Sequence, residues 1–168
     1  MRWRERGEEL ELVLDRTPFY AESGGQVADR GVIVGGGARI EVLHVYKEAD
    51  GIVHRGRLVS GTREALLKSG QSGSLAARVD PSHRLPTQRH HTATHLLHAA
   101  LRERLGAHVR QAGSAVRPDK LRFDFTHGSR LSPDDLEAVA DRGNGWIAAS
   151  APVRAIEMAR EEAERLGA

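Results

Sequence analysis

Short apolar runs with an alternating pattern characterise the N-terminal part of the chain. The runs occupy residues 10–14, 31–34 and 39–45 and are separated by glycines, including the cluster at 35–37. A period of two places apolar side chains on one face of a β-strand. Several such strands joined by glycine-rich turns are typical of a small antiparallel sheet or barrel. We therefore expect a small β-barrel over residues 1–76.

The apolar spacing becomes helical after residue 77. One helix is predicted to end at Gly106, with apolar side chains three and four residues apart at Leu96, Leu97, Ala100, Leu101 and Leu105. Residues 121–125 then alternate as a strand with three apolar side chains on one face. A short strand over 153–158 and a final helix over 161–166 follow later in the chain.

A further helix is predicted to start at Ser132. Serine is a good N-cap, Pro133 suits the first helical position, and two aspartates follow in the first turn. Gly143 and Gly145 each cost about 1 kcal/mol in a helix interior, which weakens the second half of this helix. The fold class is therefore α+β, with an N-terminal small β-barrel over 1–76 and an α+β domain over 77–168.

The composition fits a folded protein of the cytoplasm. The chain has 168 residues, of which 39% are hydrophobic, and it has no apolar run near 18 residues, so we expect no membrane-spanning helix. Its charged N-terminus lacks the apolar stretch of a secretory signal. The absence of cysteine excludes disulfides, so nothing points to an oxidising compartment.

The charge balance allows only a local nucleic-acid interface. A formal net charge of +2 is far from that of a protein that binds nucleic acid by charge alone. Candidate RNA contacts are Arg78, Arg84 and Arg89, which lead into the histidine-rich helix. The alternative is that these are solvated arginines on an arginine-rich surface.

Two histidines four residues apart form the first candidate site. On a helix, His91 and His95 lie one above the other on a single face, so both imidazoles could bind one ion. Zinc takes three or four protein ligands, so this pair is half of a zinc site. The alternative is that these are polar residues near a helix start.

The stretch Ser23-Gly24-Gly25-Gln26 also has two interpretations. In the first, the glycines form a tight turn and Gln26 simply begins a strand. In the second, the glycines let the backbone approach a ligand, and the Gln26 amide bonds a hydroxyl or carbonyl. Thr94 could likewise be a helix residue turned toward the core.

Four motifs in this order resemble a known family. They are Thr17-Pro18-Phe19-Tyr20-Ala21-Glu22-Ser23-Gly24-Gly25-Gln26, the histidine-rich run from Arg89 to Leu101, Gln111-Ala112-Gly113-Ser114, and Leu121-Arg122-Phe123-Asp124-Phe125. The chain resembles the editing domain of bacterial alanyl-tRNA synthetase and its free-standing relatives, the AlaX trans-editing proteins. The resemblance implies that Gln26 lies in the editing pocket, that the Thr94 hydroxyl lies beside the substrate amino acid, and that His91 and His95 bind zinc. In that family a Cys-Gly-Gly-Thr-His-like segment completes the zinc site, and it would fall beyond Ala168.

The implied function is hydrolysis of tRNA(Ala) mischarged with serine or glycine. An apolar alanine pocket rejects an analogue with an added hydroxyl only about 100-fold, so a second, hydrolytic site is needed. The implied partners are tRNA(Ala) and the remainder of the synthetase chain, which would ligate alanine to tRNA(Ala) using ATP. Because half of the zinc ligands are missing, we expect the isolated chain to be inactive.

Three alternatives remain open. The chain could be a catalytically inactive remnant that still binds tRNA, which the two glycines of the predicted helix and the end at Ala168 favour. It could be a free-standing AlaX-like deacylase, although such a protein should carry the missing cysteine and histidine. The threonyl-tRNA synthetase editing domain has a similar histidine pair, but it is not expected to contain Ser-Gly-Gly-Gln.

Overall fold

The computed structural model describes residues 1–152, 154 and 156–166. The described residues form an α+β fold, which confirms the predicted class. In chain order the elements are β1 (Arg2–Arg6), β2 (Glu9–Val13), β3 (Gly31–Gly35), β4 (Ala38–Glu48), β5 (Gly51–Ser60), α1 (Arg63–Gln71), β6 (Ala76–Val79), α2 (Pro81–Leu105), β7 (Gln111–Val116), β8 (Leu121–Phe125), α3 (Pro133–Ala149) and α4 (Arg160–Arg165). The strands predicted in the N-terminal part are confirmed as β2, β3 and β4.

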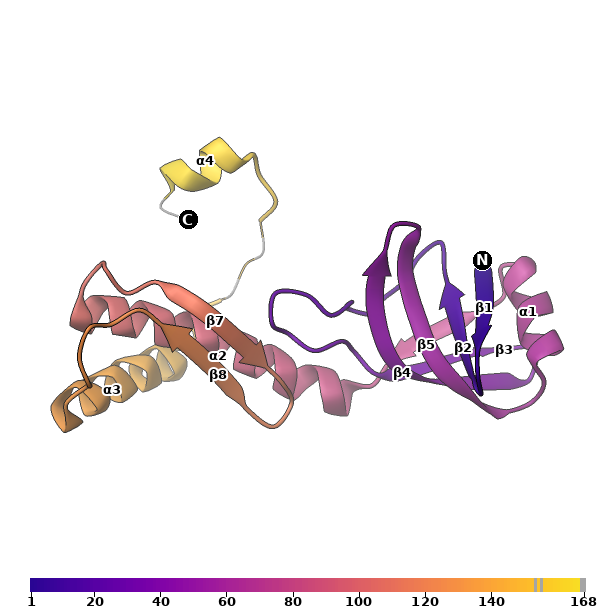
Figure 1. Cartoon of the computed structure of the whole chain (residues 1–168), viewed down its shortest axis with the longest axis horizontal. Helices are drawn as coiled ribbons and strands as arrows, with labels where there is room; N and C mark the ends of the chain where they lie inside the picture. Colours follow the sequence, from indigo (N-terminus) through magenta and orange to yellow (C-terminus); the bar gives the residue numbers. More distant parts are fainter. Residues whose placement is uncertain (153, 155, 167–168) are drawn as a thin grey trace.

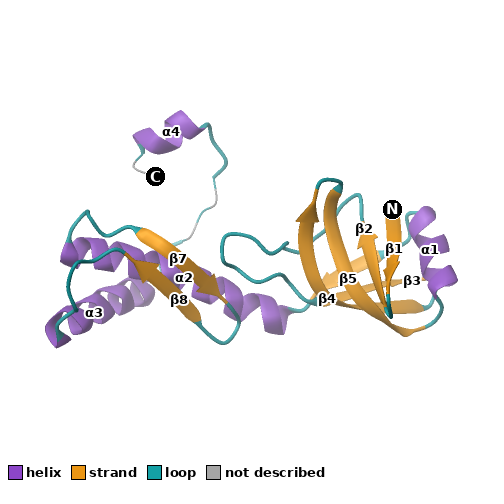
Figure 2. Cartoon of the chain, in the orientation of Figure 1, coloured by secondary structure: helices purple, strands orange, loops and turns teal. Residues whose placement is uncertain are grey.

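Six strands form one antiparallel sheet in the order β1-β2-β5-β4-β3-β6 (Figure 2). Among the described residues β1 and β6 do not pair with each other, so the sheet is open and the predicted closed barrel is not supported. A barrel requires a continuous ladder between its first and last strands. Here β1 is fully exposed and rich in arginine and glutamate, and charges of this kind protect a free sheet edge.

The core of the N-terminal part lies between one face of the sheet and α1. Leu66 of α1 is fully buried and packs with the inward-facing apolar residues of the strands, which include Leu12, Ile33, Ile40 and Val45. Each fully buried aliphatic side chain contributes about 1.5–3 kcal/mol to folding. Three residues of the long loop between β2 and β3 belong to the same core, namely Phe19, Ala21 and Ala28.

Glu11 is a buried carboxylate held by three hydrogen bonds. Its side chain is 2% exposed and accepts from Arg4, from Arg6 at 3.0 Å and from the Tyr46 hydroxyl at 2.8 Å. Burial raises the pKa of Glu11, but these bonds outweigh it and hold the pKa at about 2, against a usual 4.5. The ionised form therefore stabilises the fold above pH 4.5, and that stability is lost as the pH falls toward 2.

We expect Glu11→Gln to flatten the acid dependence of stability. The pKa difference corresponds to about 3 kcal/mol at neutral pH, because each unit is worth about 1.4 kcal/mol. The free energy of unfolding, measured by urea titration, should fall with pH below 4.5 in the wild type and much less in the variant. Parallel acid profiles for the two proteins would show that Glu11 does not carry this dependence.

The C-terminal part is built along α2 (Figure 1). This helix extends away from the sheet, and both α3 and the β7–β8 hairpin pack against it. The predicted end is confirmed, because α2 stops at Leu105 before Gly106, whose φ is 114°. Its start lies earlier than the histidine motif, since the Asp80 side chain caps the helix by accepting from the Ser82 amide at 2.9 Å. The histidines therefore lie within a long helix rather than at its beginning.

The predicted α3 is confirmed, including its capping residue. Ser132 and Asp135 form a capping box, in which each side chain bonds the backbone of the other residue. The expected weakness at Gly143 and Gly145 does not break the helix, which continues to Ala149. Stacking of the Arg142 guanidinium 4.7 Å from the centre of the Trp146 ring supports this half of the helix.

The last predicted elements have different outcomes. The final helix is confirmed as α4. The strand predicted over 153–158 includes positions 153 and 155, which lie outside the described residues, and its other residues form no strand. In the part of the chain that the structure describes, no helix is both long and apolar enough to cross a membrane.

Candidate functional site

The loop that carries Gln26 is docked on strand β7. Its backbone joins the strand through the Val116 amide, which donates to the Gly25 carbonyl at 2.8 Å, and the Val27 amide, which donates to the Val116 carbonyl at 3.1 Å. Gly25 has a φ of 81°, and a Cβ there would lie 2.3 Å from the Ser114 carbonyl oxygen. Only glycine permits this approach, so the glycines form the expected turn, whereas Gln26 begins no strand and pairs only through isolated bridges.

Docking brings Gln26 into contact with His91, 65 residues later in the chain. The Gln26 side chain is 8% exposed, and its Oε1 lies 2.6 Å from His91 Nδ1. A carbonyl oxygen only accepts, so this contact favours the His91 tautomer with the proton on Nδ1 and the lone pair of Nε2 free. The structure thus unites two residues that the sequence singled out separately.

The two histidines share one face of α2. The rings of His91 and His95 are stacked, with centroids 5.1 Å apart and planes 20° apart. Partial desolvation lowers the pKa of His91, and the nearby His95 lowers it further. Both effects favour the neutral imidazole, which is the form that binds metals.

The donor set of this pair is suited to a metal but incomplete. Imidazole nitrogen is a preferred zinc ligand, and the hydrogen bond to Gln26 fixes the His91 ring so that Nε2 remains available. Within residues 1–152, 154 and 156–166, no group of three or more His, Cys, Asp or Glu side chains could hold a metal. His91 and His95 thus fit two positions of a zinc site, and further ligands would have to come from elsewhere.

Thr94 lies near this pair but is turned inward. It is 7% exposed, and its hydroxyl donates to the His90 carbonyl at 2.8 Å within the same helix. The oxygen lone pairs remain available as acceptors. Its predicted role beside a substrate remains a proposal.

The three candidate arginines have different surroundings. Arg78 on β6 and Arg89 on α2 are exposed. Arg78 lines a hollow of about 610 Å³ together with Arg30 and Arg39, and with the carboxylates Glu41 and Asp80. Arg84 instead faces the protein, where its guanidinium binds the Asp29 carboxylate and the Pro18 carbonyl. The sequence showed the positive charge of Arg84 but not its partner, 55 residues away.

A larger hollow of about 880 Å³ lies on another face of α2. It is mostly apolar and lies between α2 and the end of α3, with Leu96 and Trp146 in its wall. None of Gln26, His91 and His95 lines it. Gln26, His91 and His95 instead come together at the loop–helix contact.

Comparisons with known proteins find similarity first to a class and then to a narrower group. The family of class II (A) tRNA synthetases matches residues 3–80. The chain is 48% identical to the alanine–tRNA ligase of Pelotomaculum thermopropionicum, 52% to that of Halorhodospira halophila and 50% to that of Thermus thermophilus. Each alignment covers 96% of this chain and 18% of the relative. Nearly the whole chain is thus homologous to one segment of alanine–tRNA ligases, and it spans less than a fifth of their length.

Proposed function

We propose that this chain is the part of an alanine–tRNA ligase that hydrolyses Ser-tRNA(Ala) and Gly-tRNA(Ala). The observation that carries the proposal is the 2.6 Å contact between Gln26 and His91. This contact joins the glycine-rich loop and the histidine pair into one polar site. The homology to alanine–tRNA ligases supports the choice of tRNA(Ala) as partner.

Substrate selection follows from hydrogen bonding. A hydrolytic site that bonds the serine hydroxyl leaves polar groups unpaired when alanine occupies it, so alanine is spared. The Gln26 amide nitrogen is available for this bond because its oxygen accepts from His91. Thr94 would contribute its hydroxyl as an acceptor.

Zinc is the metal that we propose for this site. His91 would bind it through Nε2 and His95 through one ring nitrogen, with further ligands from residues outside this pair. Bound zinc would lower the pKa of a water molecule and polarise the ester carbonyl. Gln26 keeps the His91 ring in one orientation and one tautomer for this purpose.

The exposed arginines would bind the tRNA backbone. Arg30, Arg39 and Arg78 share one hollow, and Arg89 is exposed on α2. Arginine contacts with phosphates give affinity that falls steeply with salt. A second candidate function is tRNA binding without catalysis, which is favoured because His91 and His95 are joined by no third candidate metal ligand among the residues that the structure describes.

The proposal is tested with a full-length alanine–tRNA ligase that carries this segment. We expect release of serine from Ser-tRNA(Ala) to be much faster than release of alanine from Ala-tRNA(Ala). Gln26→His and Thr94→Ile should each slow serine release by about 10-fold or more, because each alters a polar group of the pocket. If both variants kept the wild-type rates and selectivity, Gln26 and Thr94 would not belong to the pocket. If the wild type released serine only at the spontaneous rate, tRNA binding without catalysis would be favoured.

A further inference from the structure

Arg84 and Asp29 form a second contact between the loop and α2. The Arg84 Nε lies 3.0 Å from both carboxylate oxygens of Asp29, and its Nη2 donates to Asp29 Oδ2 and to the Pro18 carbonyl. The Asp29 side chain is 5% exposed, so it is a buried charge with its counterion. A planar guanidinium that binds both oxygens fixes orientation as well as distance.

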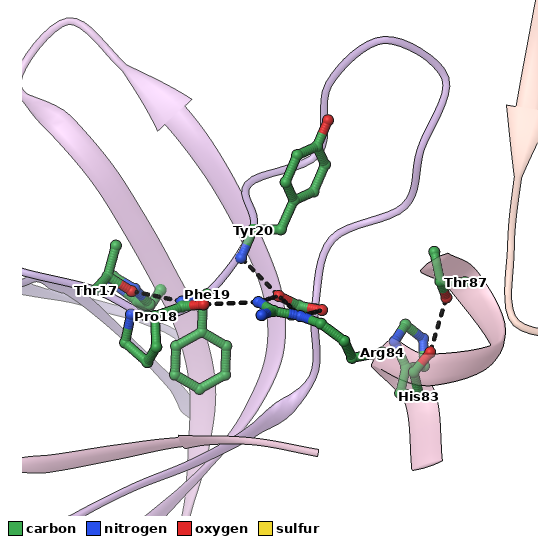
Figure 3. A network of polar contacts seen from close by, with 9 residues as sticks. Thr17, Pro18, Phe19, Tyr20, His83, Arg84 and Thr87 are labelled. Atoms are coloured by element: carbon green, nitrogen blue, oxygen red, sulfur yellow. Dashed lines mark hydrogen bonds and ion pairs between the residues drawn. The ribbon is translucent and has the colours of Figure 1, made fainter. Parts of the chain in front are cut away.

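Asp29 also closes the loop on itself. Its Oδ2 accepts from the Tyr20 amide at 2.6 Å, and its own amide donates to the Tyr20 carbonyl at 3.1 Å. Figure 3 shows Arg84 reaching from the helix toward the backbone at Pro18 and Tyr20. One carboxylate therefore ties the two sides of the loop to each other and to α2.

The two contacts are in register along the helix and the loop. Arg84 lies seven residues before His91, which is about two helical turns and places both on the same face of α2. On the loop, Gln26 lies three residues before Asp29. In the described part of the chain, the side-chain hydrogen bonds between loop 17–30 and α2 come from these two helix residues, Arg84 and His91. The backbone adds one bond at the very start of the helix, where the amide of the capping residue Asp80 donates to the Arg30 carbonyl at 2.8 Å.

We propose that the Arg84–Asp29 ion pair positions Gln26 against His91 and thereby fixes the His91 tautomer. The backbone around Gln26 is held to β7, not to α2, so its distance from His91 depends on how the loop is fastened to the helix. The Arg84–Asp29 ion pair holds the loop to α2 about two helical turns before His91. Arg84 and Asp29 are positioning residues because neither contacts the His91 ring.

The direct test is NMR of the histidine rings in this chain with Asp29→Asn and Arg84→Lys. Asparagine keeps the shape of Asp29 but loses its charge. Lysine keeps the charge of Arg84 but lacks the planar guanidinium that binds both carboxylate oxygens. We expect the wild-type His91 to show a single tautomer with the proton on Nδ1. Each variant should show a mixture, with Arg84→Lys the milder, and circular dichroism would establish that it is folded. An unchanged His91 tautomer in a folded variant would overturn the proposal.

Glu11→Gln is the matched control. Glu11 is also a buried carboxylate paired with arginines, but it lies in the sheet, away from α2. It should lower stability while leaving the His91 tautomer as in the wild type. An equal change at His91 in this control would mean that the effect is general destabilisation, which would also overturn the proposal.

Kinetics extend the test, and this part rests on the proposed function. In a full-length ligase carrying this segment, Asp29→Asn and Arg84→Lys should lower the rate constant for serine release by about 10- to 100-fold, since errors of about 1 Å have effects of this size. The double variant should be no slower than the slower single variant, because the pair acts as a unit. A raised KM with unchanged kcat and an unchanged tautomer would overturn the positioning role and indicate instead that Arg84 contacts the tRNA. A tautomer change without any serine release in the wild type would instead count against the hydrolase and leave the positioning role intact.

Discussion

Replacing Gly25 with alanine is expected to detach the loop from β7 and to destabilise the protein by about 2–5 kcal/mol. The left-handed backbone conformation at φ 81° costs about 1–2 kcal/mol for a residue with a Cβ. The added carbon would also lie 2.3 Å from the Ser114 carbonyl oxygen, which belongs to the backbone of β7. Such overpacking costs about 1–3 kcal/mol more. Urea unfolding measures the loss of stability.

Gly24→Ala is a matched control in the same turn. Gly24 also has a positive φ, of 58°, but a Cβ there would meet nothing within 4 Å. We expect this variant to cost about 1–2 kcal/mol and to keep the loop in place. If the two variants were equally stable, close approach to Ser114 would not be the reason for glycine at position 25.

The sequence predicted the elements that depend on local chemistry. The capping serine of α3 and the glycine that ends α2 act on their own backbone neighbours, so a short stretch of sequence specifies them. The start of α2 was missed although Asp80 and Pro81 form a normal helix start. Pro86 interrupts the helical pattern, because an interior proline removes one helix hydrogen bond, yet α2 continues through it to Leu105.

The tertiary part of the site could not be predicted from the pattern. Gln26 and His91 meet because the loop docks on β7, and Asp29 pairs with Arg84 across 55 residues. Sequence periodicity carries no signal for either contact. For the same reason, the sequence predicts a barrel where the structure has an open sheet, since closure depends on whether the first and last strands meet. Arg84 was interpreted as a surface charge because its acidic partner is far away in the chain.

His91→Ala is expected to have the largest effect on metal binding and hydrolysis. Removing one of two imidazoles leaves a single nitrogen ligand, which holds zinc only weakly. Zinc affinity of this chain, measured by calorimetric titration, should fall by more than about 100-fold, which exceeds the effect of losing a supporting hydrogen bond. Serine release by a full-length ligase carrying the variant should fall to the spontaneous rate.

Two further variants distinguish direct binding of zinc by a histidine from orientation of the His91 ring. Gln26→Leu leaves both imidazoles but removes the acceptor at 2.6 Å from His91 Nδ1, so zinc affinity should fall by about 10- to 100-fold. His90→Ala is the control, because its Nδ1 bonds the Arg117 carbonyl at 2.7 Å rather than the loop, and zinc affinity should not change. A graded series, with His91→Ala weakest and Gln26→Leu intermediate, is the result that assigns the metal to His91 and its orientation to Gln26. Wild-type affinity in His91→Ala, or an equal loss in His90→Ala, would place the metal elsewhere.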